Sequence, residues 1–565
     1  MPDPATTSPA EPSARPPASG PGNRLEWLCL AACWVPYALL TRKFYFLCDD
    51  AFISFRYARN WIEGYGLRFN PAEQVPVEGY SNFLWVCLAA LGELAHLDPR
   101  VFMPVISFLA GSLLMAAFFF TLRRRFELPL PLAVPACLFL GCCPSFAVWS
   151  TSGLETVPFA LLVFLTFRQL FLHRDGPAGL TAGLAGLALA LIRVEGVEWA
   201  LLIGLMAAFV HRGRSPRATR SLLVFFAILL VGYGIYFACR FAYYRLPLPN
   251  TAYVKIDPTP ATLARGFDYL VVCYLTFLAP LIALLGWPLA WRARRRSVTV
   301  PAALLALAFP AYALVVGGDF MTMGRLLVPA WPFHALLLAL LLEYLTESWR
   351  VPRPAAVAAG LAVAALGLLP AWNIHVVPES ARARFHFRLN TESYRSEYDQ
   401  WVFMSHKSAE LTDLGRVLGR IASPGDSVVI DTIGAAGYYS DLFIYDQHGL
   451  VSREVVEAAR TSDHLRSPGH DLSVSPEFFL PYRPTYLNLF VVLRGPHMAE
   501  AIQEQVERWR LRVDPNLYAP QIVNPSSITG NPQAPLLVLL RRIPEGGDPQ
   551  EVWTRYRTDL RLWSI

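Results

Sequence analysis

The sequence predicts a mainly α-helical, polytopic membrane protein with about eleven transmembrane helices, additional juxtamembrane helices and a C-terminal extracytoplasmic α/β domain. Of the 565 residues, 54% are hydrophobic and 16% are charged, and the apolar residues form repeated long runs. About eleven of these runs, between residues 25 and 372, approach the roughly 20 residues that cross a bilayer as a helix. The basic residues cluster in short linkers between the runs, which is typical of cytoplasmic loops.

The chain divides into three parts. Residues 1–22 are rich in Pro, Ala and Ser and are expected to form a disordered cytoplasmic tail. Residues 23–372 form the transmembrane domain, and residues 373–565 the α/β domain. The first apolar run, from Leu25 to Leu40, lacks a small-residue cleavage site, so we interpret it as an uncleaved anchor.

The basic clusters decide how the chain crosses the membrane. With a cytoplasmic N-terminus, the first span carries residues 43–100 to the outer side. We interpret the apolar run at residues 82–97 as a helix lying on the outer surface and residues 102–122 as the second span, because the alternative would place Arg123, Arg124 and Arg125 outside. The last span, about residues 355–372, then exits outward. Five basic linkers share the inner side: residues 123–125, 173–174, 212–220, 292–296 and 350–353.

Because topology explains the net charge of +6, no nucleic-acid partner is expected. All nine cysteines lie at or before Cys273 and form no C-x-x-C pair, which argues against a disulfide framework or a zinc site. In the C-terminal part, S-V-V-I-D, T-I-G-A-A-G-Y-Y-S and L-F-I-Y-D predict a strand, a glycine-bearing turn or short helix, and a second strand. Gly434 and Gly437 complete no G-x-G-x-x-G pattern, so no dinucleotide site is expected.

Two adjacent carboxylates, Asp49 and Asp50, directly follow the first span. Charged groups at the edge of a membrane are costly and indicate function. Helical spacing places Asp50, Ser54, Tyr57 and Trp61 on one stripe, where a carboxylate could accept a proton from an acceptor hydroxyl and aromatic rings could cover a sugar. The alternative is that Asp49 or Asp50 caps the helix that begins there, but capping does not require both.

Three cations on the predicted outer side could bind a leaving phosphate: Arg193, Lys255 and Arg325. Each could instead mark the membrane interface. Arg325 is favoured because the glycines at 317–318 end a span and Asp319 follows them, so the backbone there can approach a ligand closely.

A second polar cluster lies in the C-terminal part. Asp446 and His448 occur in Y-D-Q-H-G-L, followed by the His/Asp pairs at 463–464 and 470–471. No spacing matches a known metal site, so the sequence predicts no metal ligands and favours acceptor recognition by His448 or a structural role. Asp49 and Asp50 could hold Mg²⁺ or Ca²⁺ through oxygen ligands, but transfer from a monophosphate carrier does not require a cofactor.

Motifs along most of the chain resemble the GT-C membrane glycosyltransferases, and within them the mycobacterial AftB-like arabinofuranosyltransferases, which use decaprenylphosphoryl-arabinose. The matching motifs are D-D-A-F-I-S-F-R-Y-A-R-N, G-L-R-F-N-P, V-E-G-Y-S-N-F-L-W, T-S-G-L-E-T, R-V-E-G, P-N-T-A-Y-V-K, G-G-D-F-M-T-M-G-R-L-L-V-P and G-A-A-G-Y-Y-S. The resemblance implies a GT-C catalytic domain over residues 23–372. It also implies inversion at the anomeric carbon, with Asp49 or Asp50 as base and the lipid phosphate as leaving group. Within these motifs, Glu78, Glu155 and Asp319 are expected to bind sugar or acceptor.

The expected function is therefore transfer of a sugar, D-arabinofuranose in the first instance, from a polyprenyl-phosphate donor to an extracytoplasmic glycan or glycoconjugate. The expected location is the bacterial inner membrane, with the lipid bilayer as a further partner. Alternatives are transfer of mannose or glucose, or modification of a protein such as pilin. A lipid-linked-sugar transporter is a different class, but it should show internal repeats, which this sequence lacks.

Overall fold

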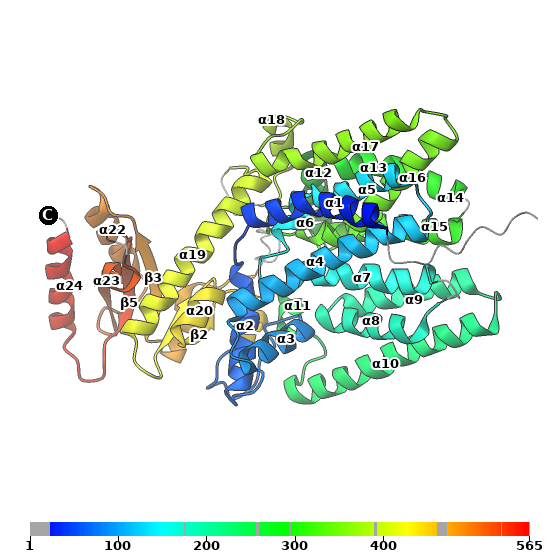
Figure 1. The fold of residues 1–565 in the computed structure, drawn as a ribbon. Helices are drawn as coiled ribbons and strands as arrows, with labels where there is room; N and C mark the ends of the chain where they lie inside the picture. Colours follow the sequence, from blue (N-terminus) through cyan, green and yellow to red (C-terminus); the bar gives the residue numbers. More distant parts are fainter. Residues whose placement is uncertain are drawn as a thin grey trace, which may run out of the picture.

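The structure is a computed structural model that describes residues 23–173, 177–255, 259–293, 295–388, 393–459, 472–530, 532 and 534–563. Long helices form a bundle, and a five-stranded sheet lies beyond one end of it (Figure 1). Three helices lie between the two: α2 (Asp49–Ile62), α19 (Glu397–Ile421) and α20 (Gly434–Ser440). The chain therefore has the predicted order of a helical part followed by an α/β part.

The bundle contains one long helix for most of the predicted apolar runs. Five helices of the described part are long and apolar enough to cross a membrane, or six if α12 and its bent continuation form one span. The predicted number of about eleven spans stays a prediction. The bundle helices are α1 (Arg24–Lys43), α4 (Pro99–Arg124), α5 (Leu130–Gly141), α7 (Thr156–Phe171), α8 (Gly179–Ile192), α9 (Gly196–His211), α10 (Pro216–Tyr244), α12 (Pro260–Thr276), α15 (Arg296–Val315), α16 (Trp331–Glu347) and α17 (Arg353–Leu368).

Short polar caps fix where several of these helices begin. Asn23 accepts a hydrogen bond from the backbone N–H of Glu26 at the start of α1. Asp98 and Ser215 cap α4 and α10 in the same way. These side chains satisfy backbone N–H groups that have no partner within the first helical turn.

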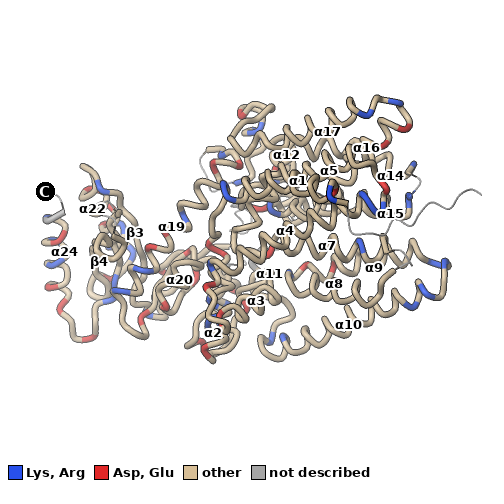
Figure 2. Tube along the Cα trace, in the orientation of Figure 1, with Lys and Arg blue, Asp and Glu red and all other residues tan. Residues whose placement is uncertain are grey.

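The basic linkers gather at the end of the bundle that faces away from the sheet (Figure 2). They lie where α4 ends, where α10 begins, beside α14 (Leu289–Arg292) and where α17 begins. This arrangement agrees with the predicted common side for these linkers. Which side of a membrane this end faces stays a prediction.

At the opposite end, α2 (Asp49–Ile62) and α3 (Phe83–Leu94) lie between the bundle and the sheet (Figure 1). The structure thus contains the two predicted extra helices between the first two long helices. However, α2 has no free polar face, since every residue from Ala51 to Ala58 is buried. It packs against α3 on one side and against α20 on another.

The sheet has the strand order β2-β1-β3-β5-β4, in which β1 pairs in parallel with β2 and β3, whereas β5 is antiparallel to β3 and β4. The predicted strand, short helix and strand are confirmed as β1, α20 and β2. The elements are α19 (Glu397–Ile421), β1 (Ser427–Ile430), α20 (Gly434–Ser440), β2 (Phe443–Asp446), α21 (Arg453–Ala459), β3 (Tyr486–Val492), α22 (Met498–Arg510), β4 (Tyr518–Val523), β5 (Leu536–Arg542) and α24 (Pro549–Trp563).

The two faces of the sheet belong to different cores. Val428 and Ile430 of β1 join the core that continues into the helical bundle, whereas Val429 between them joins a second core with Ile502 and Val506 of α22. Alternate residues of a strand point to opposite faces. The α/β part is therefore packed onto the bundle through a shared apolar core.

Candidate functional site

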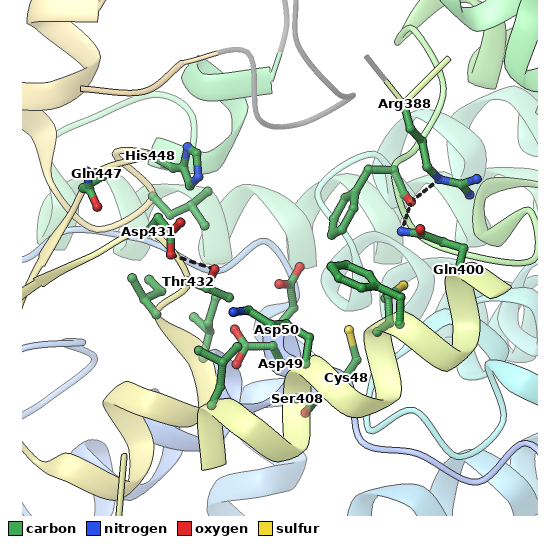
Figure 3. Close-up of a pocket in the computed structure, with 18 of the residues that line it drawn as sticks. Cys48, Asp49, Asp50, Arg388, Gln400, Ser408, Asp431, Thr432, Gln447 and His448 are labelled. Atoms are coloured by element: carbon green, nitrogen blue, oxygen red, sulfur yellow. Dashed lines mark hydrogen bonds between the residues drawn. The ribbon is translucent and has the colours of Figure 1, made fainter. Parts of the chain in front are cut away.

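A cavity of about 470 Å³ lies where the start of α2, the helix α19 and the ends of β1 and β2 meet. In the close-up view, Asp431, Gln447 and His448 line one side and Arg388 and Gln400 the other, with Asp49 and Asp50 between them (Figure 3). The cavity therefore joins groups from the N-terminal and C-terminal parts of the chain.

The parallel pairing of β1 and β2 places the polar groups on the sheet side. Asp431 and Thr432 directly follow β1, and Gln447 and His448 directly follow β2. The carboxyl ends of parallel strands lie at the same edge of a sheet, and ligands commonly bind there. This edge faces Asp50 across the cavity (Figure 3).

The carboxylate of Asp50 is available to a ligand in the cavity. It is half-buried and lines the cavity. Among the described residues, its carboxylate makes neither a hydrogen bond nor an ion pair, although the charge of Arg325 lies within electrostatic range. A carboxylate with free oxygens in a cavity can accept a proton from a bound hydroxyl.

Asp49, in contrast, is fully engaged by the protein. Its Oδ2 accepts a hydrogen bond from the backbone N–H of Gly434 at 2.9 Å, and its Oδ1 accepts one from Ala435 at 2.8 Å. Burial raises the pKa of Asp49 to about 7, and the neighbouring Asp50 acts in the same direction. The alternative that Asp49 caps the helix beginning there is therefore wrong, because Asp49 instead accepts hydrogen bonds from the first N–H groups of α20. At the start of α2 itself, Cys48 is the N-cap residue and makes no side-chain cap bond.

Three predicted site residues meet in a buried polar network that does not line the cavity. Arg193 pairs with Glu195 at 2.7 Å and with Glu155 at 3.2 Å. The other oxygen of Glu155 accepts a hydrogen bond from Asn82 at 2.8 Å, and Asn82 accepts one from the Ser54 hydroxyl at 3.1 Å. The structure therefore links Ser54, Glu155 and Arg193 to one another through Asn82. None of the three lines the cavity.

Arg325 connects this network to Asp50. Its Nε pairs with Asp319 Oδ2 at 2.7 Å, and its guanidinium lies 5.6 Å from the ring centre of Trp149. The charges of Asp50, Arg193 and Glu155 all lie within its electrostatic range. Arg325 thus lies within electrostatic range of both Asp50 and Arg193, and a cation in such a place can stabilise the charge on a leaving phosphate.

The structure does not bring Tyr57 and Trp61 to the cavity. The Tyr57 hydroxyl is buried, donates to the carbonyl of Val77 at 2.7 Å and accepts from the N–H of Gly79 at 2.8 Å. Trp61 is 38% exposed near the other end of α2. The predicted common face of Asp50, Ser54, Tyr57 and Trp61 is therefore absent, because α2 is packed on more than one side.

Glu78 lies at a different place. It pairs with Arg240 at 2.5 Å beside a small cavity of about 60 Å³, which Arg193 also lines. Lys255 is the last residue of the short helix α11 (Asn250–Lys255), and its side chain lies outside the described residues.

His448 does line the cavity. Its ring Nδ1 is 2.9 Å from the carbonyl oxygen of Leu472, and its backbone N–H donates to Asp446 Oδ1 at 2.9 Å. The buried Asp446 also accepts from the N–H of Val451, and burial raises its pKa to about 6. Asp446 therefore shapes the turn that presents His448. The His/Asp pairs at 463–464 and 470–471 lie outside the described residues. The described residues contain no group of three His, Cys, Asp or Glu side chains that could hold a metal.

Sequence reasoning missed the wall that α19 contributes, including Phe403 and Lys407. These two residues are four positions apart, so the sequence places them on one helical face. It gives no sign of what that face meets. Arg56, in the motif that begins with Asp49, was also missed.

Comparisons with known proteins agree with this architecture. Residues 396–524 match the model of a domain of unknown function, DUF8728. No curated protein matches the chain. ArnT from Cupriavidus metallidurans, solved with undecaprenyl phosphate bound, is 14% identical, with a TM-score of 0.50 over 91% of this chain and 97% of ArnT. Apo ArnT gives a TM-score of 0.52 at the same identity and coverage.

The mycobacterial arabinofuranosyltransferase AftD is 15% identical over 93% of this chain and 42% of AftD, with a TM-score of 0.43. The chain thus has a fold similar to that of ArnT, and the likeness covers 91% of this chain.

Proposed function

We propose that the protein transfers a sugar from a polyprenyl-phosphate donor to an acceptor hydroxyl on the outer side of the membrane, with Asp50 as the general base. The observation that carries the proposal is the carboxylate of Asp50, which has no hydrogen-bond or ion-pair partner among the described residues, lines the cavity and lies within electrostatic range of Arg325. The GT-C fold shared with ArnT, which was solved with undecaprenyl phosphate, supports a lipid-phosphate carrier.

The chemistry is a single displacement. Asp50 accepts the proton of the acceptor hydroxyl as its oxygen forms a bond to the anomeric carbon. The bond between that carbon and the phosphate oxygen breaks, and the lipid phosphate leaves with the electron pair. Arg325 and Arg193 stabilise the charge that develops on the phosphate, and Lys255 is proposed to assist them. Attack from the face opposite the phosphate inverts the anomeric configuration.

We also propose the identity of the sugar, a residue that binds the acceptor and the orientation in the membrane. The motifs that resemble AftB-like enzymes favour arabinofuranose as the sugar, with mannose and glucose as the next candidates. His448 is proposed to bind the acceptor, because it lines the cavity opposite Asp50. The basic end of the bundle is proposed to face the cytoplasm of a bacterial inner membrane, which places the cavity and the C-terminal domain outside.

Release of polyprenyl phosphate from labelled lipid-linked sugars, by purified protein in lipid nanodiscs, tests the proposal. Asp50→Asn should lower transfer by about 10²- to 10⁴-fold, the usual contribution of a general base. Asp413→Asn, on the exposed side of α19, is the matched control and should keep full activity. Transfer by Asp50→Asn at the rate of this control would refute the role of Asp50. No turnover of any polyprenyl-phosphate sugar by the wild type would refute the reaction class.

A further inference from the structure

The short helix α20 is held at both ends by α2. At its N-terminal end, Gly434 and Ala435 donate their N–H groups to Asp49. At its C-terminal end, Arg56 donates to the carbonyl of Gly437 and to that of Leu442, both at 2.7 Å. These bonds satisfy backbone groups that a helix leaves unpaired at its two ends.

The spacing of these two side chains matches the length of the helix that they hold. Asp49 and Arg56 are seven positions apart on α2, about 10 Å along a helix axis. The helix α20 spans Gly434–Ser440, which is seven residues and hence about the same length. Arg56 is almost fully buried, and its guanidinium also lies 4.4 Å from the ring centre of Phe69. The two helices therefore run side by side in the same direction.

The two glycines of G-A-A-G permit this close approach. A Cβ at Gly434 would lie 2.0 Å from the backbone oxygen of Asp49, and one at Gly437 would lie 2.8 Å from Nη1 of Arg56. No real Cβ makes the first of these contacts without displacing the backbone. Gly434 and Gly437, which complete no dinucleotide-binding motif, thus allow α20 to contact α2.

From these contacts we propose that Asp49 and Arg56 form a clamp that docks the C-terminal domain on α2, so that the ends of β1 and β2 form the acceptor-binding wall opposite Asp50. In this arrangement Asp49 is a positioning residue and not a second base, because both of its carboxylate oxygens are occupied by N–H groups. The segment that connects β1 to α20 contains Asp431 and Thr432, which line the cavity. Holding α20 fixes that segment directly.

This proposal rests on the proposed function. It predicts different effects on the binding of the acceptor and of the donor. Arg193 and Arg325, which are assigned to the donor phosphate, make none of the clamp contacts. Loosening the clamp should therefore raise the KM for the acceptor and leave donor binding intact. A general loss of structure would weaken both.

The test uses the full chain in nanodiscs, with Asp49→Ala, Arg56→Gln and Gly434→Ala, and the milder Asp49→Asn in case Asp49→Ala fails to fold. Gly495→Ala is the matched control, because a Cβ there would meet no atom within 4 Å. Equilibrium binding of radiolabelled undecaprenyl phosphate reports on the donor site. Steady-state transfer at varied acceptor concentration separates kcat from KM.

The clamp variants should raise the KM for the acceptor about tenfold or more and change undecaprenyl phosphate binding by less than about twofold. Hydrogen exchange at residues 434–440 should become faster in Asp49→Ala and Arg56→Gln but not in the control. Unchanged exchange, or an unchanged acceptor KM, would overturn the proposal. If the wild type transfers no sugar, the proposed function fails, while the exchange measurement still decides whether the clamp exists.

Discussion

A buried ion pair holds the segment that carries Arg325, and breaking it should destabilise the protein measurably. Arg388 and Glu397 lie 2.9 Å apart, with side chains only 4% and 0% exposed. Arg388 also donates to the carbonyls of Phe320 and Met321, and Glu397 accepts from the backbone N–H of Met323. This pair therefore fastens the loop after α15 to the start of α19.

The expected loss of stability follows from the two buried groups that lose Glu397 as a partner in Glu397→Ala. The substitution strands the Arg388 charge in a buried site and removes the acceptor of a buried N–H group, which together cost about 3–5 kcal/mol. One decade in an equilibrium constant corresponds to about 1.4 kcal/mol, so the ratio of folded to unfolded protein should fall by about two to three and a half decades. The double variant Arg388→Met/Glu397→Ala should recover part of the loss, because no charge is then left unpaired.

Denaturant-induced unfolding in mild detergent, followed by tryptophan fluorescence, measures these differences. Glu410→Ala is the matched control, since this glutamate on α19 is 63% exposed and lies 3.9 Å from its partner Lys407. Exposed pairs of this kind contribute about 0–1 kcal/mol. The reasoning is refuted if Glu397→Ala unfolds at the denaturant concentration of the control, or if the double variant is less stable than Glu397→Ala alone.

Three further predictions concern single charged groups. Because burial raises the pKa of Asp49 to about 7 from an ordinary value of 3.8, the unfolded chain releases this proton at lower pH than the folded one. The contribution of Asp49 to wild-type stability should therefore fall as the pH rises from about 4 to 7. Asn does not titrate, so the melting temperature of Asp49→Asn minus that of the wild type should increase from pH 5 to pH 7. A difference that is the same at pH 5, 6 and 7 would contradict this. Arg325→Gln should lower polyprenyl phosphate release about 10²-fold, with Arg325→Lys intermediate, because a cation near the leaving phosphate is lost. Equal rates for wild type and Arg325→Gln would remove this residue from the site. Glu78→Gln should lower the melting temperature because Arg240 then lacks its buried partner, and Glu78→Gln/Arg240→Gln should restore part of it; a double variant that melts below the single one would argue against the pair.

Much of the fold was predictable because helices and strands follow local patterns. The apolar run at residues 25–40 became α1, the run at 102–122 lies within α4, and S-V-V-I-D and L-F-I-Y-D became β1 and β2. Each of these depends on the spacing of neighbouring residues and on nearby caps or glycines. The pairing of β3, β4 and β5 connects strands distant in sequence, and no local pattern indicated it.

The candidate site was predictable in its residue types but less so in its arrangement. The stripe of Ser54, Tyr57 and Trp61 assumed that α2 buries one face, whereas α3 and α20 cover it on more than one side. Ser54 and Tyr57 consequently form hydrogen bonds within the protein. Helical periodicity places residues on a face, but it does not tell what covers that face.

Taken by itself, the sequence determined that the chain forms a helical bundle with one basic end, and that two carboxylates follow its first helix. Only the tertiary structure decided that these carboxylates differ. Asp49 caps a helix 385 residues away, and Asp50 faces the cavity. The physical reason is that local sequence fixes which backbone groups within one or two helical turns can pair. The partner of a lone carboxylate is decided by how distant segments pack, which the single sequence does not contain.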